Sequence, residues 1–406
     1  MSVEKKSFSL YVHIPFCFSK CDYCDFFSIP CGENKIPDLY FEALINEAKI
    51  RVEKENITSW SSIYFGGGTP ALMTPLQIKK YIPQIIGEMG FKHSAKEFTF
   101  EMNPEAVSEE KINVLKEVGV NRLSLGIQSM NDNALCSVNR HCSRKNIFDA
   151  MELIKKNWQG HLSLDVIAGL PDQSDDEFYK SLKEVVAFEV DHISLYTLTL
   201  EKNTPLYKKM NRGLSFDFDA ADRQWLLGAE FLEKNGFFQY EVSNFAKKGF
   251  ESFHNMSYWK QKNYIGLGAG AHSSIYYFDT FAGRRINNIN DIKLYTDFYT
   301  GTDKLSLEKK IPYETEQLSL ETLEFEFLMM GLRCLSGISS LEYKKRFCKM
   351  KNYVELGKRL GEKNGLWKKE MDNKNAEVIF VSEKEKIYRL TKKGLLFLNR
   401  ILEELM

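Results

Sequence analysis

The sequence predicts an α/β protein in which six βα units are followed by a smaller α+β domain. Short segments rich in β-branched, aromatic and aliphatic residues recur along the first half of the chain, with helical stretches between them. This alternation is typical of a parallel sheet, either wound into a six-strand barrel or open and doubly wound. The six predicted strands cover residues 8–14, 60–65, 97–102, 122–127, 162–167 and 192–197.

Helix-start signals support the segments between these strands. Thr74 precedes Pro75 and Gln77, and Ser174 stands three residues before Glu177, so both predict capping boxes that open amphipathic helices. A further helix is expected over 220–234, after the sixth strand. Residues 1–235 are therefore predicted to form the first domain.

The pattern changes after residue 235. A strand is expected within 236–245, and a Gly- and aromatic-rich stretch over 253–285 indicates irregular structure, so 236–310 is predicted to connect two domains. Residues 311–406 predict three helices, a β-ribbon and a closing helix, an order that resembles a winged helix. Because its lysines alternate with glutamates, we expect a structural role for this domain and not DNA binding.

Charge and hydropathy exclude several classes of protein. The 406 residues include 55 basic and 55 acidic side chains, so there is no overall positive charge to attract nucleic acid. No apolar run reaches the roughly 18 residues of a membrane span, and the N-terminal residues lack a continuous apolar signal core. We therefore expect a cytoplasmic protein without a transmembrane segment.

Three of the eight cysteines lie together in CFSKCDYC, directly after the first predicted strand. These are Cys17, Cys21 and Cys24. A structural zinc site is the simplest alternative, but it normally needs four protein ligands, and Cys31 is the nearest further candidate. Three thiolates on one loop favour a four-iron cluster in which one iron stays open to a small molecule.

The motifs around these cysteines resemble the radical S-adenosylmethionine (SAM) superfamily, and within it the coproporphyrinogen dehydrogenase-like branch. The resemblance rests on YVHIPFCFSKCDYCDF at 11–26, YFGGGTP at 64–70, EMNPE at 101–105, GIQS at 126–129, VNRH at 138–141 and LDVIAGLP at 164–171. It implies a partial (β/α)6 barrel with a [4Fe-4S] cluster whose open iron chelates SAM. It also implies that an electron from the cluster cleaves SAM to a 5'-deoxyadenosyl radical.

All of these motifs except VNRH end a predicted strand, and strand ends of parallel βα barrels converge on ligands. The rim is therefore expected to gather Cys17, Gly66 to Gly68, Glu101, Gln128, Asp165 and Tyr196. The resemblance assigns to SAM the residues Tyr11, Tyr23, Gly67, Gly68, Thr69, Glu101, Gln128, Arg140 and Asp165, with Arg140 on its carboxylate. The alternatives are a plain glycine turn, a surface ion pair for Arg140, loop caps for the acids and amide, and core packing for the tyrosines.

Two functions fit this resemblance. One is an oxygen-independent coproporphyrinogen III dehydrogenase, and the other is a HemW-type heme chaperone that delivers heme to an acceptor protein. The dehydrogenases carry a fourth cysteine where this chain has Phe26, and a longer segment before the cluster than the 16 residues here. These differences favour the chaperone, although whether SAM is also cleaved stays open.

The sequence HNMSYW at 254–259 matches the HNxxYW motif associated with heme in HemW-type proteins. A neutral imidazole is a common iron ligand, so His254 is the predicted heme ligand, with Tyr258 as an alternative and His272 as a weaker one. The simpler interpretation of His254 is a hydrogen-bonded loop histidine. The expected partners are heme, a heme-acceptor protein and, if SAM is cleaved, an electron donor such as a flavodoxin or ferredoxin.

Overall fold

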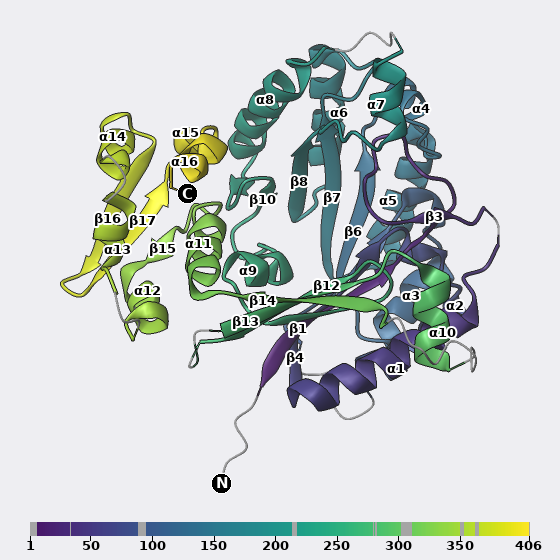
Figure 1. The fold of residues 1–406 in the computed structure, drawn as a ribbon. Helices are drawn as coiled ribbons and strands as arrows, with labels where there is room; N and C mark the ends of the chain where they lie inside the picture. The colour runs from purple at the N-terminus through teal and green to yellow at the C-terminus, as the bar shows by residue number, and fades with distance from the viewer. Residues whose placement is uncertain are drawn as a thin grey trace.

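A computed structural model describes residues 6–32, 34–87, 95–212, 217–278, 280, 282–301, 311–349, 353–361 and 365–405. Its centre is a row of parallel strands that curves into a partial barrel (Figure 1). The strands are β1 (Ser7–Ile14), β4 (Ser59–Gly67), β5 (Glu97–Met102), β6 (Arg122–Gln128), β7 (His161–Ala168) and β8 (His192–Thr197). The predicted α/β class and all six predicted strands are confirmed.

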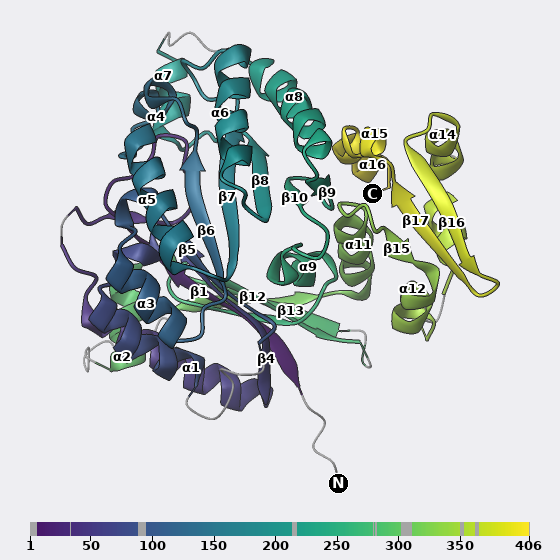
Figure 2. The same ribbon diagram turned by 180° about the vertical axis from the view of Figure 1, so that it is seen from behind.

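Helices cover the outer face of this barrel (Figure 2). They are α1 (Asp38–Glu55), α2 (Pro75–Ile86), α3 (Glu109–Glu117), α5 (Arg144–Asn157), α6 (Asp175–Ala187) and α8 (Ala220–Lys234). The short helices α4 (Asp132–Ser137) and α7 (Pro205–Met210) lie at the end of the barrel where the parallel strands end. Both predicted capping boxes are present, at Thr74 with Gln77 and at Ser174 with Glu177. Each box satisfies backbone N–H groups that a helix start leaves without partners.

The stretch 236–310 contains more regular structure than the sequence predicts. Its elements are β9 (Phe238–Gln239), β10 (Asn244–Ala246), α9 (Phe253–Trp259), β11 (Tyr264–Leu267), β12 (His272–Tyr277), β13 (Ala282–Asn288) and α10 (Ile292–Thr300). Together with β14 (Tyr313–Leu318), they extend the sheet to the order β14-β13-β12-β11-β1-β4-β5-β6-β7-β8-β10-β9. Strands such as β13, with the sequence AGRRINN, carry too few apolar residues to be recognised by pattern.

The C-terminal unit packs beside the barrel around a hydrophobic core of its own. It contains α11 (Leu320–Gly331), β15 (Ile338–Ser339), α12 (Ser340–Phe347), α13 (Leu356–Gly361), α14 (Leu366–Asp372), β16 (Ala376–Ser382), β17 (Glu385–Leu390), α15 (Lys392–Leu395) and α16 (Leu398–Leu405). Its three strands pair in the order β15-β17-β16. An ion pair between Lys392 and Glu233 links this unit to α8.

The barrel interior is polar, whereas the main apolar core lies between the strands and the outer helices. Across the interior, the hydroxyl of Ser62 donates to Ser9 at 2.9 Å, and Ser163 Oγ lies 2.7 Å from His192 Nδ1. Alternate strand residues point to opposite faces, which separates the two environments. In the described part of the chain, no helix is long and apolar enough to cross a membrane.

Candidate functional site

A cavity of about 450 Å³ opens at the C-terminal ends of the parallel strands. Most of the predicted site residues meet there, although they come from seven separate segments of the chain. Those lining it are Cys17, Cys21, Tyr23, Cys24, Gly67, Gly68, Thr69, Glu101, Gln128, Arg140, Asp165 and Tyr196. The rim position that strand-end reasoning predicts is therefore where the structure gathers these side chains.

Backbone hydrogen bonds hold the cysteine loop on both sides. Strands β2 (Phe16–Cys17) and β3 (Ile29–Pro30) pair in parallel, and the N–H of Cys31 donates to the carbonyl of Cys17 at 2.8 Å. Farther along, the N–H of Asp22 donates to Val138 and its carbonyl accepts from Leu206, both at 2.9 Å. The cysteine loop is thereby positioned before any ligand binds.

Arg140 lies beside this loop with its guanidinium buried. Nη1 is 3.7 Å from Cys21 Sγ, while Nη2 donates to Asn103 Oδ1 at 3.2 Å and to the carbonyl of Gly126. Its Nε is buried with no hydrogen-bond partner in the described chain. A buried donor without an acceptor is costly, so this arrangement suits a carboxylate that enters the cavity. The surface ion pair considered for Arg140 does not describe this geometry.

Glu101 and Asp165 place two carboxyl groups in the same cavity. Glu101 accepts from Tyr64 Oη at 2.7 Å and from the N–H of Gly67 at 3.1 Å. Asp165 accepts from Ser124 Oγ at 3.3 Å. Burial raises the pKa of Glu101 to about 7 and also raises the pKa of Asp165. Both carboxyl groups are thus destabilised as anions until a cation or further donor reaches them.

Two glycines permit the close packing of this cavity wall. Gly67 has φ +109°, in the region that L side chains rarely adopt. A Cβ on Gly126 would lie 2.8 Å from Gln128 Nε2 and 3.3 Å from Arg140 Nη2. Gln128 itself has φ +66°, a strained backbone conformation that marks the end of β6.

Two predicted site residues, Tyr11 and His254, lie outside this cavity. The hydroxyl of Tyr11 is 2.9 Å from His13 Nδ1, and its ring packs beside Tyr64 below the cavity floor. A contact of Tyr11 with SAM stays a prediction.

His254 lies on α9, which faces the barrel interior and is not part of an irregular loop. Its side chain is 1% exposed, and burial lowers its pKa to about 3, so the imidazole is neutral. Nδ1 is 2.8 Å from Ser62 Oγ, and Nε2 is 2.7 Å from Tyr258 Oη. Both ring nitrogens are occupied, so iron ligation by His254 requires one of these bonds to break.

His254 is also closer to the rim site than its sequence position indicates. Its ring centroid is 5.0 Å from that of Tyr64, the tyrosine that donates to Glu101. Tyr64 therefore connects His254 to the rim carboxylate, although His254 itself does not line the rim cavity.

Comparisons with known proteins agree with this geometry. The model of the radical SAM superfamily matches residues 11–185. The heme chaperone HemW of Bacillus subtilis (strain 168) is 35% identical over 84% of this chain and 86% of its own length. The HemW of Buchnera aphidicola subsp. Schizaphis graminum is 31% identical over 97% of both chains.

This chain belongs to the HemW family of radical SAM proteins.

A solved structure is similar to the fold over nearly its whole length. Coproporphyrinogen III oxidase (HemN) from Escherichia coli, described as a radical SAM enzyme, aligns with a TM-score of 0.79 at 21% identity. The alignment covers 99% of this chain and 90% of the other. This likeness supports the partial-barrel fold and its C-terminal extension, and at this identity it supports nothing further.

Radical SAM proteins carry a [4Fe-4S] cluster and SAM, and the donor set at the rim fits both. In the described residues, no three His, Cys, Asp or Glu side chains gather closely enough to hold one metal ion. A single zinc ion draws its ligands to within about 2.3 Å of one centre, whereas each thiolate of an iron–sulfur cluster binds a different iron. The three cysteine thiols that line the rim cavity match the donor set of such a cluster.

Sequence reasoning missed three residues that support the site: Tyr64, Asn103 and Ser124. Tyr64 donates a hydrogen bond to Glu101, and Ser124 donates one to Asp165. Asn103 accepts a hydrogen bond from Arg140. Tyr64 and Ser124 precede Gly66 and Gly126 by two positions, which places them on the same strand face. This spacing of two residues was the feature of the sequence that could have indicated that Tyr64 and Ser124 lie on the same strand face as the two glycines.

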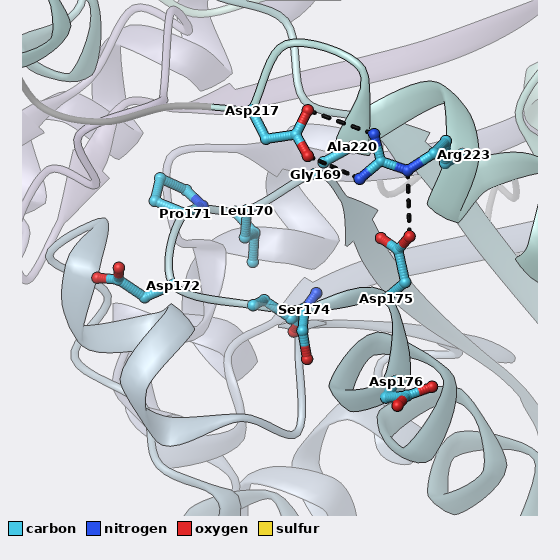
Figure 3. A pocket seen from close by; sticks show the side chains of 11 residues that line it. Gly169, Leu170, Pro171, Asp172, Ser174, Asp175, Asp176, Asp217, Ala220 and Arg223 are labelled. Atoms are coloured by element: carbon cyan, nitrogen blue, oxygen red, sulfur yellow. Dashed lines mark hydrogen bonds and ion pairs between the residues drawn. The ribbon is translucent and has the colours of Figure 1, made fainter.

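A second cavity of about 510 Å³ lies beside the loop that follows β7 (Figure 3). It is acidic, but Arg223 bridges two of its carboxylates, Asp175 at 3.1 Å and Asp217 at 2.7 Å. These ion pairs join the start of α6 to the start of α8. Asp172 and Asp176 also line the cavity, so its lining stays acidic, and the ion pairs of Arg223 form a structural contact between the two helices.

Proposed function

We propose that this protein is a heme chaperone, which binds heme and transfers it to an acceptor protein in the cytoplasm. The observation that carries the proposal is the likeness to a protein named heme chaperone HemW at 35% identity over 86% of that protein's length. The likeness to the HemW of Buchnera aphidicola extends over 97% of both chains, so it includes the C-terminal unit and α9 as well as the barrel.

Phe26 favours the chaperone over the second candidate, coproporphyrinogen III dehydrogenase. The resemblance places the dehydrogenases' fourth cysteine at this position, and a phenyl ring cannot act as a thiol there. Phe26 lines the cavity and is 69% exposed, so it changes the chemistry of the cavity mouth directly. The dehydrogenase is favoured only by the fold likeness to HemN.

The rim residues are proposed to hold the cofactors. With the cluster on Cys17, Cys21 and Cys24, bound SAM would supply reductive cleavage chemistry when an electron donor such as a flavodoxin or ferredoxin is present. The unpaired Nε of Arg140 suits the carboxylate of SAM, and Glu101 suits its cationic amine.

Anaerobic reconstitution followed by two assays on the same sample tests this proposal. Heme titration should show saturable binding, and coproporphyrinogen should not be converted when SAM and a reductant are supplied. A Cys24→Ser variant gives the background for any conversion that does not need the cluster. Turnover of coproporphyrinogen by the wild type, without saturable heme binding, would replace the chaperone by the dehydrogenase.

A further inference from the structure

Two turns of the chain contribute to the wall of the rim cavity. The first follows β4 and contains a short 3-10 helix over Pro70–Leu72, and the second follows β5 and contains one over Pro104–Ala106. Pro70 from the first turn and Glu105 from the second both line the cavity. Since β4 and β5 are neighbouring strands, the separation of these two turns determines how wide this part of the cavity is.

Lys111, near the start of α3, joins the two turns. Its Nζ donates to the carbonyl of Ala71 at 2.5 Å and to the carbonyl of Ala106 at 3.0 Å. Ala71 belongs to the first 3-10 helix, and Ala106 ends the second. The end of a short helix leaves carbonyls without N–H partners, and the ammonium group supplies a donor to one carbonyl of each helix.

The two turns are also fixed to other parts of the site. In the first, the N–H of Thr69 donates to the carbonyl of Phe16 at 2.8 Å, directly before the cysteine loop. In the second, the N–H of Ala106 donates to the carbonyl of Asn103 at 3.0 Å, and the side chain of Asn103 accepts from Arg140 at 3.2 Å. A change in the separation of the turns would therefore reach both the cysteine loop and the guanidinium proposed to bind SAM.

The surroundings of the Lys111 ammonium differ from those of an ordinary surface lysine. Lys111 is half-buried, and burial lowers its pKa to about 8, opposed by the exposed carboxylate of Glu110. Removing a cation from water is costly unless hydrogen bonds compensate, so the two carbonyls determine where this group lies. Lys116 on the same helix is exposed and donates to one carbonyl, that of Asn157 at 2.9 Å, which joins only the outer helices α3 and α5.

We propose that Lys111 is a positioning residue for SAM, which clamps the turn after β4 to the turn after β5 and so fixes the width of the rim cavity. Lys111 does not line the cavity, so it acts through the two turns and not by contact with SAM. The inference rests on the SAM site proposed for the rim, and it adds the side chain that holds two parts of that site together.

Calorimetric titration of the anaerobically reconstituted full chain with SAM tests the clamp. Lys111→Met keeps an unbranched apolar side chain and removes both hydrogen bonds, so SAM affinity should fall by roughly tenfold at unchanged iron and sulfide content. Lys111→Arg keeps a cation with several N–H donors and should retain most of the wild-type affinity. Lys116→Met is the matched control and should bind SAM as the wild type does.

Hydrogen–deuterium exchange of the protein without SAM tests the same clamp in the absence of a ligand. The N–H groups of Met73 and Val107 donate to the first residues of the two 3-10 helices, at 2.9 and 3.2 Å, so their exchange reports on the two turns. Both amides should exchange faster in Lys111→Met, because each turn has lost its link to the other. Neither should change in Lys116→Met.

The outcomes separate this inference from the proposed SAM site. If the wild type binds no SAM, the rim proposal fails and this inference fails with it. If the wild type binds SAM and Lys111→Met binds it equally tightly, Lys111 has a structural role only, and this inference alone is overturned. Equal losses of affinity in Lys111→Met and Lys111→Arg would assign the effect to the shape of the side chain and would also overturn the clamp.

Discussion

The two ends of the barrel are built from the same strands but differ in how completely their polar groups are paired. At the C-terminal rim, Arg140 has a buried Nε without a partner and Gln128 has a strained backbone. At the base, Glu97 accepts from Ser252 Oγ at 3.0 Å and from the N–H groups of Phe253 and His254 at 2.8 and 3.0 Å. Unpaired polar groups and backbone strain indicate a ligand-binding site, whereas a carboxylate whose hydrogen bonds are all made within the protein indicates a structural closure of the barrel.

This difference explains why two motifs that look equally functional in the sequence have different structural roles. The rim motifs place side chains around an open cavity. The N-terminal part of HNMSYW, at His254, closes the base of the barrel, because Glu97 accepts hydrogen bonds from the backbone N–H groups at the start of α9. Each of the following experiments probes one end of the barrel and uses a control that the comparison defines.

The largest effect is expected at the cysteines of the rim. Cys17→Ala, Cys21→Ala or Cys24→Ala should each abolish the cluster, because alanine provides no ligand for iron. Iron and acid-labile sulfide content, with the visible absorption spectrum, measure this loss. The other cysteines should tolerate alanine: Cys31, Cys136, Cys142, Cys334 and Cys348. Isolation of the protein with one zinc and no sulfide would contradict the rim assignment.

The next effect is expected at the base. Glu97→Ala removes the acceptor of α9 and takes from Arg122, 3.9 Å away, its ion-pair partner, which leaves this buried cation with the carbonyl of Phe250 as its hydrogen-bond acceptor. The free energy of unfolding should fall by about 3 to 5 kcal/mol, measured by urea denaturation. Glu117→Ala removes an exposed pair with Lys79 and should cost about 1 kcal/mol or less. Equal losses in the two variants would mean that the base is not a structural closure.

A smaller effect is expected for SAM at the rim. Arg140→Ala should weaken SAM binding by roughly ten- to a hundredfold, because a charge-assisted hydrogen bond to a carboxylate is lost. Calorimetry on the reconstituted protein measures this, with iron content determined in parallel. Arg144→Ala is the control, since Arg144 forms an exposed pair with Glu184. Unchanged SAM affinity in Arg140→Ala would leave Arg140 with a structural role only.

A pH dependence is expected at Glu101. Its pKa is raised from 4.5 to about 7 by burial, so the folded protein binds more protons than the unfolded chain between these values. Stability should therefore decrease as pH rises from about 4.5 through 7, by about 3 kcal/mol at most, since one pKa unit corresponds to about 1.4 kcal/mol. Glu101→Gln should flatten this part of the curve in urea titrations at several pH values. A curve identical to that of the wild type would remove Glu101 as its source.

Much of the rim could be predicted because its motifs stand at strand ends that the local pattern identifies. Glu101, Asp165 and Gly67 were found in this way, and all three line the cavity. Tyr11 was placed with them from the resemblance, yet its side chain lies below the cavity and contacts His13. A strand pattern locates the end of the chain segment, but it does not tell how deep in the barrel a side chain lies.

The sequence by itself determined the six parallel strands, the capped starts of α2 and α6, and the grouping of three cysteines on one loop. These features depend on neighbours within a few residues, so local stereochemistry decides them. Only the tertiary structure decided which face of α9 is buried, because its partners Ser62 and Glu97 lie 192 and 157 residues away in the chain from His254. A seven-residue helix carries too weak a pattern to determine which of its faces turns into the barrel, and the buried carboxylate of Glu97 makes that choice.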